Sequence, residues 1–190
     1  MHEIEPYHNW RLLYAAEQDE RSPLFGQEHS EFEYSNTVYN YYIHPQWDEM
    51  GSRTLYLKIL FTEYEQHFAI IEFIGEWNDA LENDIMQLKR TIIDPMMEKG
   101  IFKFILIGEN IMNFHGSDDS YYEEWQEEIA DQGGWITFLN LPEQSLQEFK
   151  SEHLDRYCYF LDYPKWRTHQ PEDLFQMIDN NLLRLTSRDD

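Results

Sequence analysis

The apolar residues of the chain follow a regular spacing from about residue 53 onward. Four of them occupy every second position: Leu55, Leu57, Ile59 and Phe61. This alternation is typical of a β-strand. A polar turn then leads to the almost continuous apolar run 68–74, which is typical of a central strand buried on both faces. The two strands are expected to form an antiparallel hairpin.

Helical spacing follows the hairpin. Apolar residues recur at steps of four and three: Leu81, Ile85, Leu88, Ile92 and Met96. This spacing predicts a helix with one apolar face. Asp79 and Glu82 resemble a capping box at its start, Pro95 is expected to kink it, and Gly100 suits its end.

Strands and helices alternate from there to the C-terminus. Further strands are expected at 102–107, 135–139 and 157–161, and further helices begin at Ser120, Pro142 and Pro171. Strand–helix–strand units of this length form right-handed crossovers between parallel strands. Residues 51–190 are therefore predicted to be a single α/β domain. Its mixed sheet begins with an antiparallel hairpin and continues with parallel strands and crossover helices.

Residues 1–50 lack this rhythm and are interpreted as an N-terminal extension packed on the core. Pro6 is expected to open a short helix with Trp10, Leu13 and Tyr14 on one face. The run 38–43 is expected to add a strand, ended by His44-Pro45. Four nearby rings either pack the extension onto the domain or line a ligand groove: Tyr39, Tyr41, Tyr42 and Trp47.

Charge restricts the classes of partner. The 190 residues hold 14 Lys plus Arg against 37 Asp plus Glu, a formal net charge of −23. A field of that sign repels nucleic-acid phosphates and anionic lipid, so nucleic-acid binding is not expected. The acidic surface is interpreted as a solvated face or as a contact for a basic protein partner.

Cysteine content and hydropathy indicate the compartment. Cys158 is the only cysteine, which excludes an internal disulfide or a cysteine-based zinc site. The N-terminal residues lack the basic-then-apolar pattern of a signal peptide, and no apolar run approaches the ~20 residues that cross a bilayer. A cytoplasmic protein without a membrane span is expected.

The predicted sheet directs attention to one edge. Ligands of open α/β sheets gather beyond the carboxyl ends of the parallel strands. Loops at 75–79, 108–119, 140–141 and 162–165 would share that edge, and 108–119 is the longest of them. The candidate ligand- or partner-binding residues are Glu76, Trp77, Asn78, Asp79, Glu109, Asn113, His115, Ser117, Asp118 and Asp119.

Two interpretations of the loop 108–119 stay open. His115 with Asp118 or Asp119, joined by Glu76 or Glu109, would suit a divalent cation such as Mn, Fe or Zn. Alternatively, Ser120 caps its helix and the two aspartates favour the positive helix end. The sequence contains no fixed-spacing metal motif, no nucleophile elbow and no glycine-rich phosphate loop, so no catalytic residue is assigned and no bound cofactor is expected.

A local match adds a resemblance. The apolar run Phe104-Ile105-Leu106-Ile107 is followed by Phe114-His115-Gly116-Ser117 just before a predicted helix. Together with the element order over residues 53–161, this resembles the anti-sigma-factor-antagonist (STAS-type) fold and its lipid-binding relatives. The resemblance implies a non-catalytic regulatory or small-ligand-binding module in which Ser117 occupies a phosphoryl-accepting position.

Three functional hypotheses follow. The first is a non-enzymatic domain that binds a protein or small ligand at the edge formed by 75–79 and 108–119. The second is a metal-assisted enzyme that uses His115, Asp118 and Asp119 with Glu76 or Glu109. The third is an assembly subunit that forms a homodimer through exposed rings of the N-terminal extension.

Overall fold

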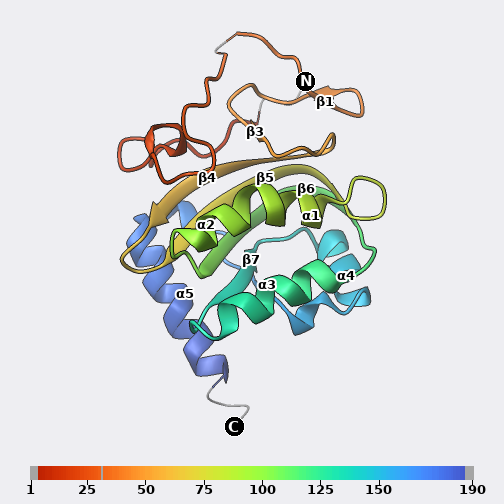
Figure 1. Cartoon of the computed structure of the whole chain (residues 1–190). Coiled ribbons are helices and arrows are strands. Elements are labelled where there is room, and N and C mark those ends of the chain that lie inside the picture. Colours follow the sequence, from red (N-terminus) through yellow and green to blue (C-terminus); the bar gives the residue numbers. More distant parts are fainter. Residues whose placement is uncertain (1–3, 31, 187–190) are drawn as a thin grey trace.

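The computed structural model describes residues 4–30 and 32–186, and its centre is a six-stranded mixed sheet (Figure 1). The strands lie in the order β3 (Asp48–Glu49), β4 (Leu55–Glu63), β5 (Phe68–Asn78), β6 (Lys103–His115), β7 (Trp135–Leu139) and β8 (Tyr159–Leu161). β3, β4 and β5 pair antiparallel, whereas β5 to β8 pair parallel. The predicted fold class, with a hairpin followed by parallel strands, is confirmed.

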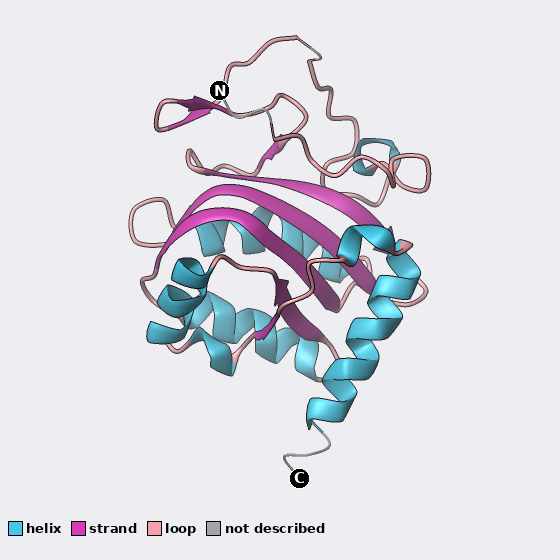
Figure 2. Ribbon diagram, turned by 180° about the vertical axis from the view of Figure 1, so that it is seen from behind, coloured by secondary structure: helices cyan, strands magenta, loops and turns pink. Residues whose placement is uncertain are grey.

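Helices cover both faces of the sheet (Figure 2). They are α1 (Asp84–Leu88), α2 (Asp94–Glu98), α3 (Ser120–Ala130), α4 (Glu143–Ser151) and α5 (Pro171–Thr186). Ile71 and Phe73 of β5 belong to the core that also contains residues of α1, α3 and α4. Phe68 of β5 points to the opposite face, where its ring stacks on Phe175 of α5 at 4.0 Å. Burial on both faces explains why this strand is nearly all apolar.

The segment before β4 covers the rest of the α5 side of the sheet. Trp10 is 2% exposed and packs edge-on against Tyr7 and Trp166. The expected helix around it is absent from the described residues. The chain forms turns there, followed by the 3₁₀ turn η1 (Ala16–Gln18), and Leu13 is 55% exposed. The prediction of a helical face with Leu13 inside was therefore wrong, and Trp10, together with the half-buried Tyr7 and Tyr14, anchors this part.

The predicted strand at 38–43 is instead a tight hairpin. β1 (Thr37–Val38) pairs antiparallel with β2 (Tyr41–Tyr42), and Tyr39 at the turn has φ 53°. Val38 and Ile43 are buried against Trp47, Tyr56 and Ile74 in a small core of their own. Hairpin turns of two residues favour positive φ, which explains why the strand breaks at Tyr39.

Two predicted loops are strand. The regions 75–79 and 108–119 were expected to be loops, but β5 runs to Asn78 and β6 runs to His115. The physical reason is that the two strands stay paired through two irregularities of register, with Ile111 and Phe114 buried. The connection from β6 to α3 is consequently only residues 116–119.

The first helix begins later than its sequence pattern predicts. Asp79 is not its N-cap residue: the helix starts at Asp84, after Asn83 in a left-handed conformation with φ 54°, and Leu81 is 82% exposed. A π-helical turn (Lys89–Ile93) then separates α1 from α2. Pro95, which has no N–H to donate, lies at the start of α2 directly after this irregular turn, where the kink was expected.

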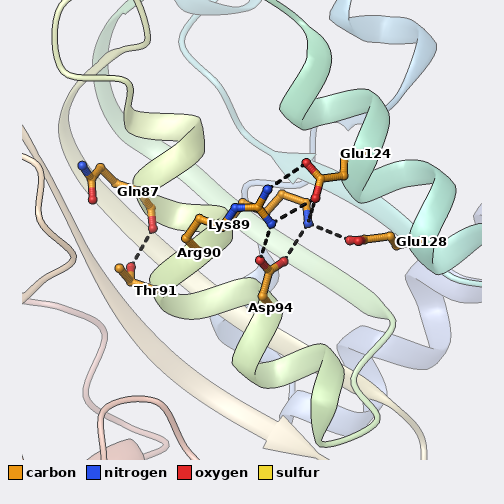
Figure 3. A network of polar contacts seen from close by, with 7 residues as sticks. All are labelled: Gln87, Lys89, Arg90, Thr91, Asp94, Glu124 and Glu128. Carbon is orange, nitrogen blue, oxygen red and sulfur yellow. Dashed lines mark hydrogen bonds and ion pairs between the residues drawn. The ribbon is translucent and has the colours of Figure 1, made fainter.

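Lys89 joins this helix to α3 by a polar network (Figure 3). Its side chain is fully buried, and its Nζ lies 2.7 Å from Asp94, 2.6 Å from Glu128 and 3.2 Å from Glu124. Burial alone would lower the pKa of Lys89, but hydrogen bonds to these three carboxylates raise it above the usual value. Neighbouring Arg90 contacts Asp94 and Glu124 from the solvent side, with its side chain 49% exposed.

We expect Lys89→Met to lower the free energy of unfolding by about 2 kcal/mol, because three carboxylates lose a buried cation. This cost is smaller than the ~3–5 kcal/mol of breaking a fully buried ion pair, because the three carboxylates reach solvent. Arg90→Met is the matched control, and its loss is expected to cost much less because water screens its exposed pairs. Urea unfolding followed by circular dichroism measures both. Equal losses in the two variants would contradict the structural role given to Lys89.

Candidate functional site

The carboxyl ends of β5 and β6 lie side by side and form one rim, at the right of Figure 1. Asn78 pairs with His115 at the end of the ladder. The N–H of Asp79 then donates to the His115 carbonyl oxygen at 2.8 Å. The turn after β5 and the loop after β6 therefore meet at one edge, as the parallel arrangement requires. We call this edge the carboxyl rim.

Glu76 is the acid at the centre of the carboxyl rim. Its side chain is 7% exposed, and it accepts hydrogen bonds from the Asn78 amide at 2.9 Å and from the Tyr39 hydroxyl. The Nε2 atom of His115 lies 3.7 Å from Glu76 Oε2, and the His115 side chain is 51% exposed. A half-exposed imidazole thus sits over a nearly buried carboxylate.

Gly75 fixes the direction of Glu76. Its φ is +120°, and a Cβ atom there would collide with the carbonyl oxygen of Thr54 on β4. That same oxygen accepts the N–H of Glu76 at 2.9 Å. Only glycine combines this backbone conformation with so close an approach, so the β4–β5 pairing holds Glu76 in place.

Two buried aspartates brace the turn beside the rim. Asp79 accepts three hydrogen bonds, from Trp77 Nε1 at 3.0 Å, the Tyr122 hydroxyl at 2.7 Å and the Ile85 N–H at 2.8 Å. Burial raises the pKa of Asp79 to about 7 despite these donors. Asp84 accepts the Asn78 N–H at 2.7 Å, and burial raises its pKa to about 6.

Three of the predicted site residues therefore serve the fold. Trp77 is fully buried and packs against the rings of Phe138 and Phe149. Asp79 holds Trp77 to the start of α1. Asn78 binds Glu76 through its amide and accepts the Leu81 N–H at 2.9 Å, which shapes the turn. None of the three presents a free functional group to solvent.

The short loop 116–119 presents the exposed groups. Ser117 and Asp118 are exposed, and the Asp118 carboxylate accepts the Ser120 N–H at 2.8 Å. Hydrogen bonding to Ser120 holds the pKa of Asp118 below its usual value. Asp119, half-buried, accepts the Tyr157 hydroxyl at 2.9 Å. The aspartates thus lie at the start of α3, as the alternative interpretation of this loop expected. Its other part was wrong: Ser120 is the first helical residue, and Asp119 occupies the N-cap position.

A shallow hollow opens next to the loop. Its volume is about 370 Å³, and its lining is Ala80, Phe114, His115, Gly116, Glu148, Ser151 and Glu152. Glu148 also accepts the Phe114 N–H at 3.0 Å. Asn113, half-buried near the end of β6, pairs with Glu76 in the ladder. Most predicted candidates thus gather at or beside the carboxyl rim.

Glu109 lies at another part of the same edge, where the residues that follow β7 and β8 meet it: its carboxylate accepts the Asn140 amide at 2.9 Å. It lies within β6, where its carboxylate contacts Arg167 Nη1 at 2.7 Å and accepts Trp166 Nε1 at 2.7 Å. Arg167 also approaches Glu72 of β5 at 3.6 Å, and Glu72 accepts the N–H of Tyr7 at 2.8 Å. Glu109 was predicted to lie in a loop, whereas it lies within β6; its contact with Asn140, directly after β7, agrees with the predicted edge.

The cluster of Glu72 and Arg167 was missed at the level of sequence. Burial raises the pKa of Glu72 to about 7. The sequence does contain a sign of this cluster: Glu72 is the one charged residue inside the apolar run 68–74, and a charge in a central strand requires a partner. Its partners, Tyr7 and Arg167, lie far away in the chain and could not be named from that signal.

The candidate metal ligands do not converge. Within residues 4–30 and 32–186, no group of three or more His, Cys, Asp or Glu side chains is arranged to hold a metal ion. His115 faces Glu76, whereas Asp118 and Asp119 are engaged by Ser120 and Tyr157. The metal-assisted enzyme therefore lacks its ligand set in this part of the chain.

Comparisons with known proteins give similarity of fold alone. No protein-family model matches the sequence, and no curated protein matches it. The unphosphorylated anti-sigma factor antagonist SpoIIAA is 13% identical over 65% of this chain and 96% of that chain, with a TM-score of 0.49. Its phosphorylated Bacillus form is 14% identical over 64% and 98%, with a TM-score of 0.43.

A putative anti-sigma factor antagonist of Thermotoga maritima is 14% identical over 50% of this chain and 81% of that chain, with a TM-score of 0.41. The resemblance is one of fold. The fold class itself rests on the strand order and pairing described above. Among the described helices, none is long and apolar enough to cross a bilayer.

We expect the free energy of unfolding to fall as the pH rises from about 4 to 7. Asp79 has a raised pKa in the folded state, so the folded chain binds more protons than the unfolded chain in this window. Asp79→Asn removes one such group, and the decline becomes shallower by up to ~1.4 kcal/mol per pH unit. Asp84 and Glu72, whose pKa values are also raised by burial, keep part of the decline.

Urea unfolding at several pH values measures this slope. Asp131→Asn, at an exposed position after α3, is the matched control for the loss of one carboxylate. If the free energy of unfolding changed with pH in the same way for wild type and Asp79→Asn, Asp79 would titrate as an ordinary surface acid.

Proposed function

We propose that this chain is a non-enzymatic binding domain that holds a protein partner at the carboxyl rim. One observation carries the proposal: His115 is half-exposed over the nearly buried Glu76, between the exposed loop 116–119 and the shallow hollow. Rigid strands thus present polar groups at an edge where the chain also opens to solvent. Such an edge is where open α/β sheets bind their ligands.

The chemistry of the rim favours binding over catalysis. Its buried acids are engaged in bracing the turn, since Asp79 and Asp84 accept backbone and ring donors. In the described part of the chain, no serine or cysteine is hydrogen-bonded to a histidine, so no activated nucleophile is formed. Burial raises the pKa of the Cys158 thiol far above its usual range, which disfavours the reactive thiolate.

A protein partner suits the shape of the edge better than a small molecule. The hollow is open and bordered by Glu148 and Glu152, whereas small-ligand sites are enclosed and mostly apolar. A protein surface covers such an open edge together with the neighbouring loop. The homodimer predicted through rings of the N-terminal extension is a separate possibility, and a light-scattering mass equal to the monomer would exclude it.

Phosphorylation of Ser117 is the regulatory step that the fold resemblance implies, and it stays a proposal. Ser117 is exposed in the loop 116–119, where a modifying enzyme can reach it. A phosphate would add about −1.5 to −2 charges next to Asp118 and Asp119. The added repulsion would disfavour an acidic partner and strengthen the contact with a basic one.

We expect His115→Ala and Asp118→Asn to weaken capture of the partner about tenfold, because both side chains are exposed beside the rim and contribute nothing to the described core. The tagged full chain is cross-linked in a lysate of its native cells, and the captured proteins are quantified by mass spectrometry. A captured protein is assigned as a partner when its amount falls with His115→Ala.

Two variants control for the loss of an exposed histidine and an exposed acid. His67→Asn lies at the other end of β5, where asparagine tolerates the positive φ of 62°, and Asp131→Asn follows α3. Both are expected to capture the same proteins as wild type. Capture that is unchanged in His115→Ala and Asp118→Asn would refute binding at the carboxyl rim.

A further inference from the structure

Three tyrosines of the β1–β2 hairpin are turned toward solvent. Tyr39 is 63% exposed, Tyr41 49% and Tyr42 46%. The hairpin beneath them is firmly held, because Val38 and Ile43 are each 1% exposed in the small core with Trp47. The alternative in which these rings pack the extension onto the domain therefore holds for Trp47, whereas the tyrosine rings are largely exposed and Tyr39 meets the domain through its hydroxyl.

The hairpin reaches the carboxyl rim. The Tyr39 hydroxyl donates to Glu76, so the tip of the hairpin touches the acid over which His115 sits. Figures 1 and 2 both place the hairpin and the turn after β5 at the same end of the sheet. That turn adds Leu81, 82% exposed, and the neighbouring Ala80 N–H donates to the His115 carbonyl oxygen at 3.4 Å.

Tyr39, Glu76 and His115 are in contact at the carboxyl rim, and the rest of the hairpin and the turn that carries Leu81 lie at the same end of the sheet. We call this set of residues the tyrosine–glutamate surface, and it consists of Tyr39, Tyr41, Tyr42, Glu76, Leu81 and His115. Tyrosine is enriched at protein interfaces because its ring gives a large contact area at low cost in conformational entropy. Exposed rings on a rigid hairpin are thus a pre-organised contact.

Apart from His115, the charged groups on and beside this surface are acidic. Among the described residues, the only ion pair of Glu76 is with His115. Arg53, next to the turn, is already paired with Glu82 at 2.6 Å. Glu148, Glu152 and Asp118 add further negative charge beside His115. A cation from outside would therefore meet complementary charge.

We infer that the tyrosine–glutamate surface binds a protein segment that presents an arginine or lysine flanked by apolar side chains. The cation pairs with Glu76 and lies against the tyrosine rings, which attract cations through their faces. The flanking apolar groups pack on Leu81 and Tyr42. The inference rests on the proposed function, since it gives the carboxyl rim a partner of defined chemistry.

Other occupants fit the charge less well. A second copy would bring two acidic surfaces together in a chain whose net charge is −23, and an anionic membrane would be repelled in the same way. A basic segment is attracted by the whole molecule as well as by Glu76. Its binding should weaken as salt is added, because exposed charges are screened.

Peptide display tests the inference. A library of random linear peptides of about a dozen residues is selected on the immobilised full chain, and the dissociation constant of an enriched peptide is measured by fluorescence anisotropy. We expect enriched peptides to carry an arginine or lysine beside an apolar residue. Replacing that cation by glutamine should weaken binding at least tenfold.

Variants of the chain locate the contact. Glu76→Gln and Tyr42→Ser are each expected to weaken binding of the peptide about five- to tenfold. Glutamine keeps one carbonyl oxygen that accepts from the Asn78 amide, and its NH2 group can donate to the Tyr39 hydroxyl oxygen. Tyr42 is exposed outside the small core, so both variants should fold. Phe25→Ser, at another ring that is 53% exposed but outside this surface, is the matched control. Melting temperatures verify folding.

The outcomes separate the inference from the proposed function. The inference would be overturned if His115→Ala weakened peptide binding but Glu76→Gln, Tyr42→Ser and replacement of the peptide's cation did not. Binding at the carboxyl rim would then still stand. Peptides insensitive to every one of these variants, or a selection without enriched basic peptides, would overturn it as well. A dimer by light scattering that Tyr42→Ser dissociates would assign the surface to a second copy instead.

Discussion

The parallel pairing of β5 with β6 is the constraint on which the site depends. The two strands remain hydrogen-bonded through two changes of register until Asn78 meets His115. Because a parallel ladder brings both carboxyl ends to the same edge, Glu76 and His115 become neighbours although 39 positions separate them. Shorter strands would have left two independent loops.

Buried carboxylates hold the chain around this ladder. Asp79 and Asp84 organise the turn after β5, and Glu72 binds the N-terminal segment through the N–H of Tyr7. Burying such groups is costly, as their raised pKa values show. In return, Asp79 receives donors from β5, α1 and α3, Asp84 receives one from the end of β5, and Glu72 receives one from the irregular N-terminal segment. The acids thus fix the positions of segments that apolar packing alone would leave undefined.

The order of the core elements could be predicted from the sequence, because periodicity reports which side chains are buried. Leu55 to Phe61 and the run 68–74 identified the hairpin correctly, and Ser120 and Pro171 marked true helix starts. The extension of β6 was missed since Glu109, Asn110 and Asn113 read as a polar loop. Ile111 and Phe114, both buried, carried the opposite signal.

The site could be predicted only in part. Its edge and most of its residues follow from the rule for parallel strands, but the functions of single side chains do not. Asp79 with Glu82 imitates a helix cap, whereas the structure uses Asp79 to join Trp77, Tyr122 and Ile85. Whether Tyr39 or Trp47 is buried depends on how the hairpin lies on β4 and β5, which local spacing does not encode.

The cover on the second face of the sheet comes from both ends of the chain. Trp10 and Tyr7 from the N-terminal segment meet Trp166, which lies in the 3₁₀ turn before α5, and Phe175 of α5 stacks on Phe68. A fragment trimmed to residues 53–161 would keep every strand of the parallel ladder yet strip this side bare. The fragment 53–161 would thus expose an apolar face and tend to aggregate. An expressed fragment should therefore retain the N-terminal segment and α5.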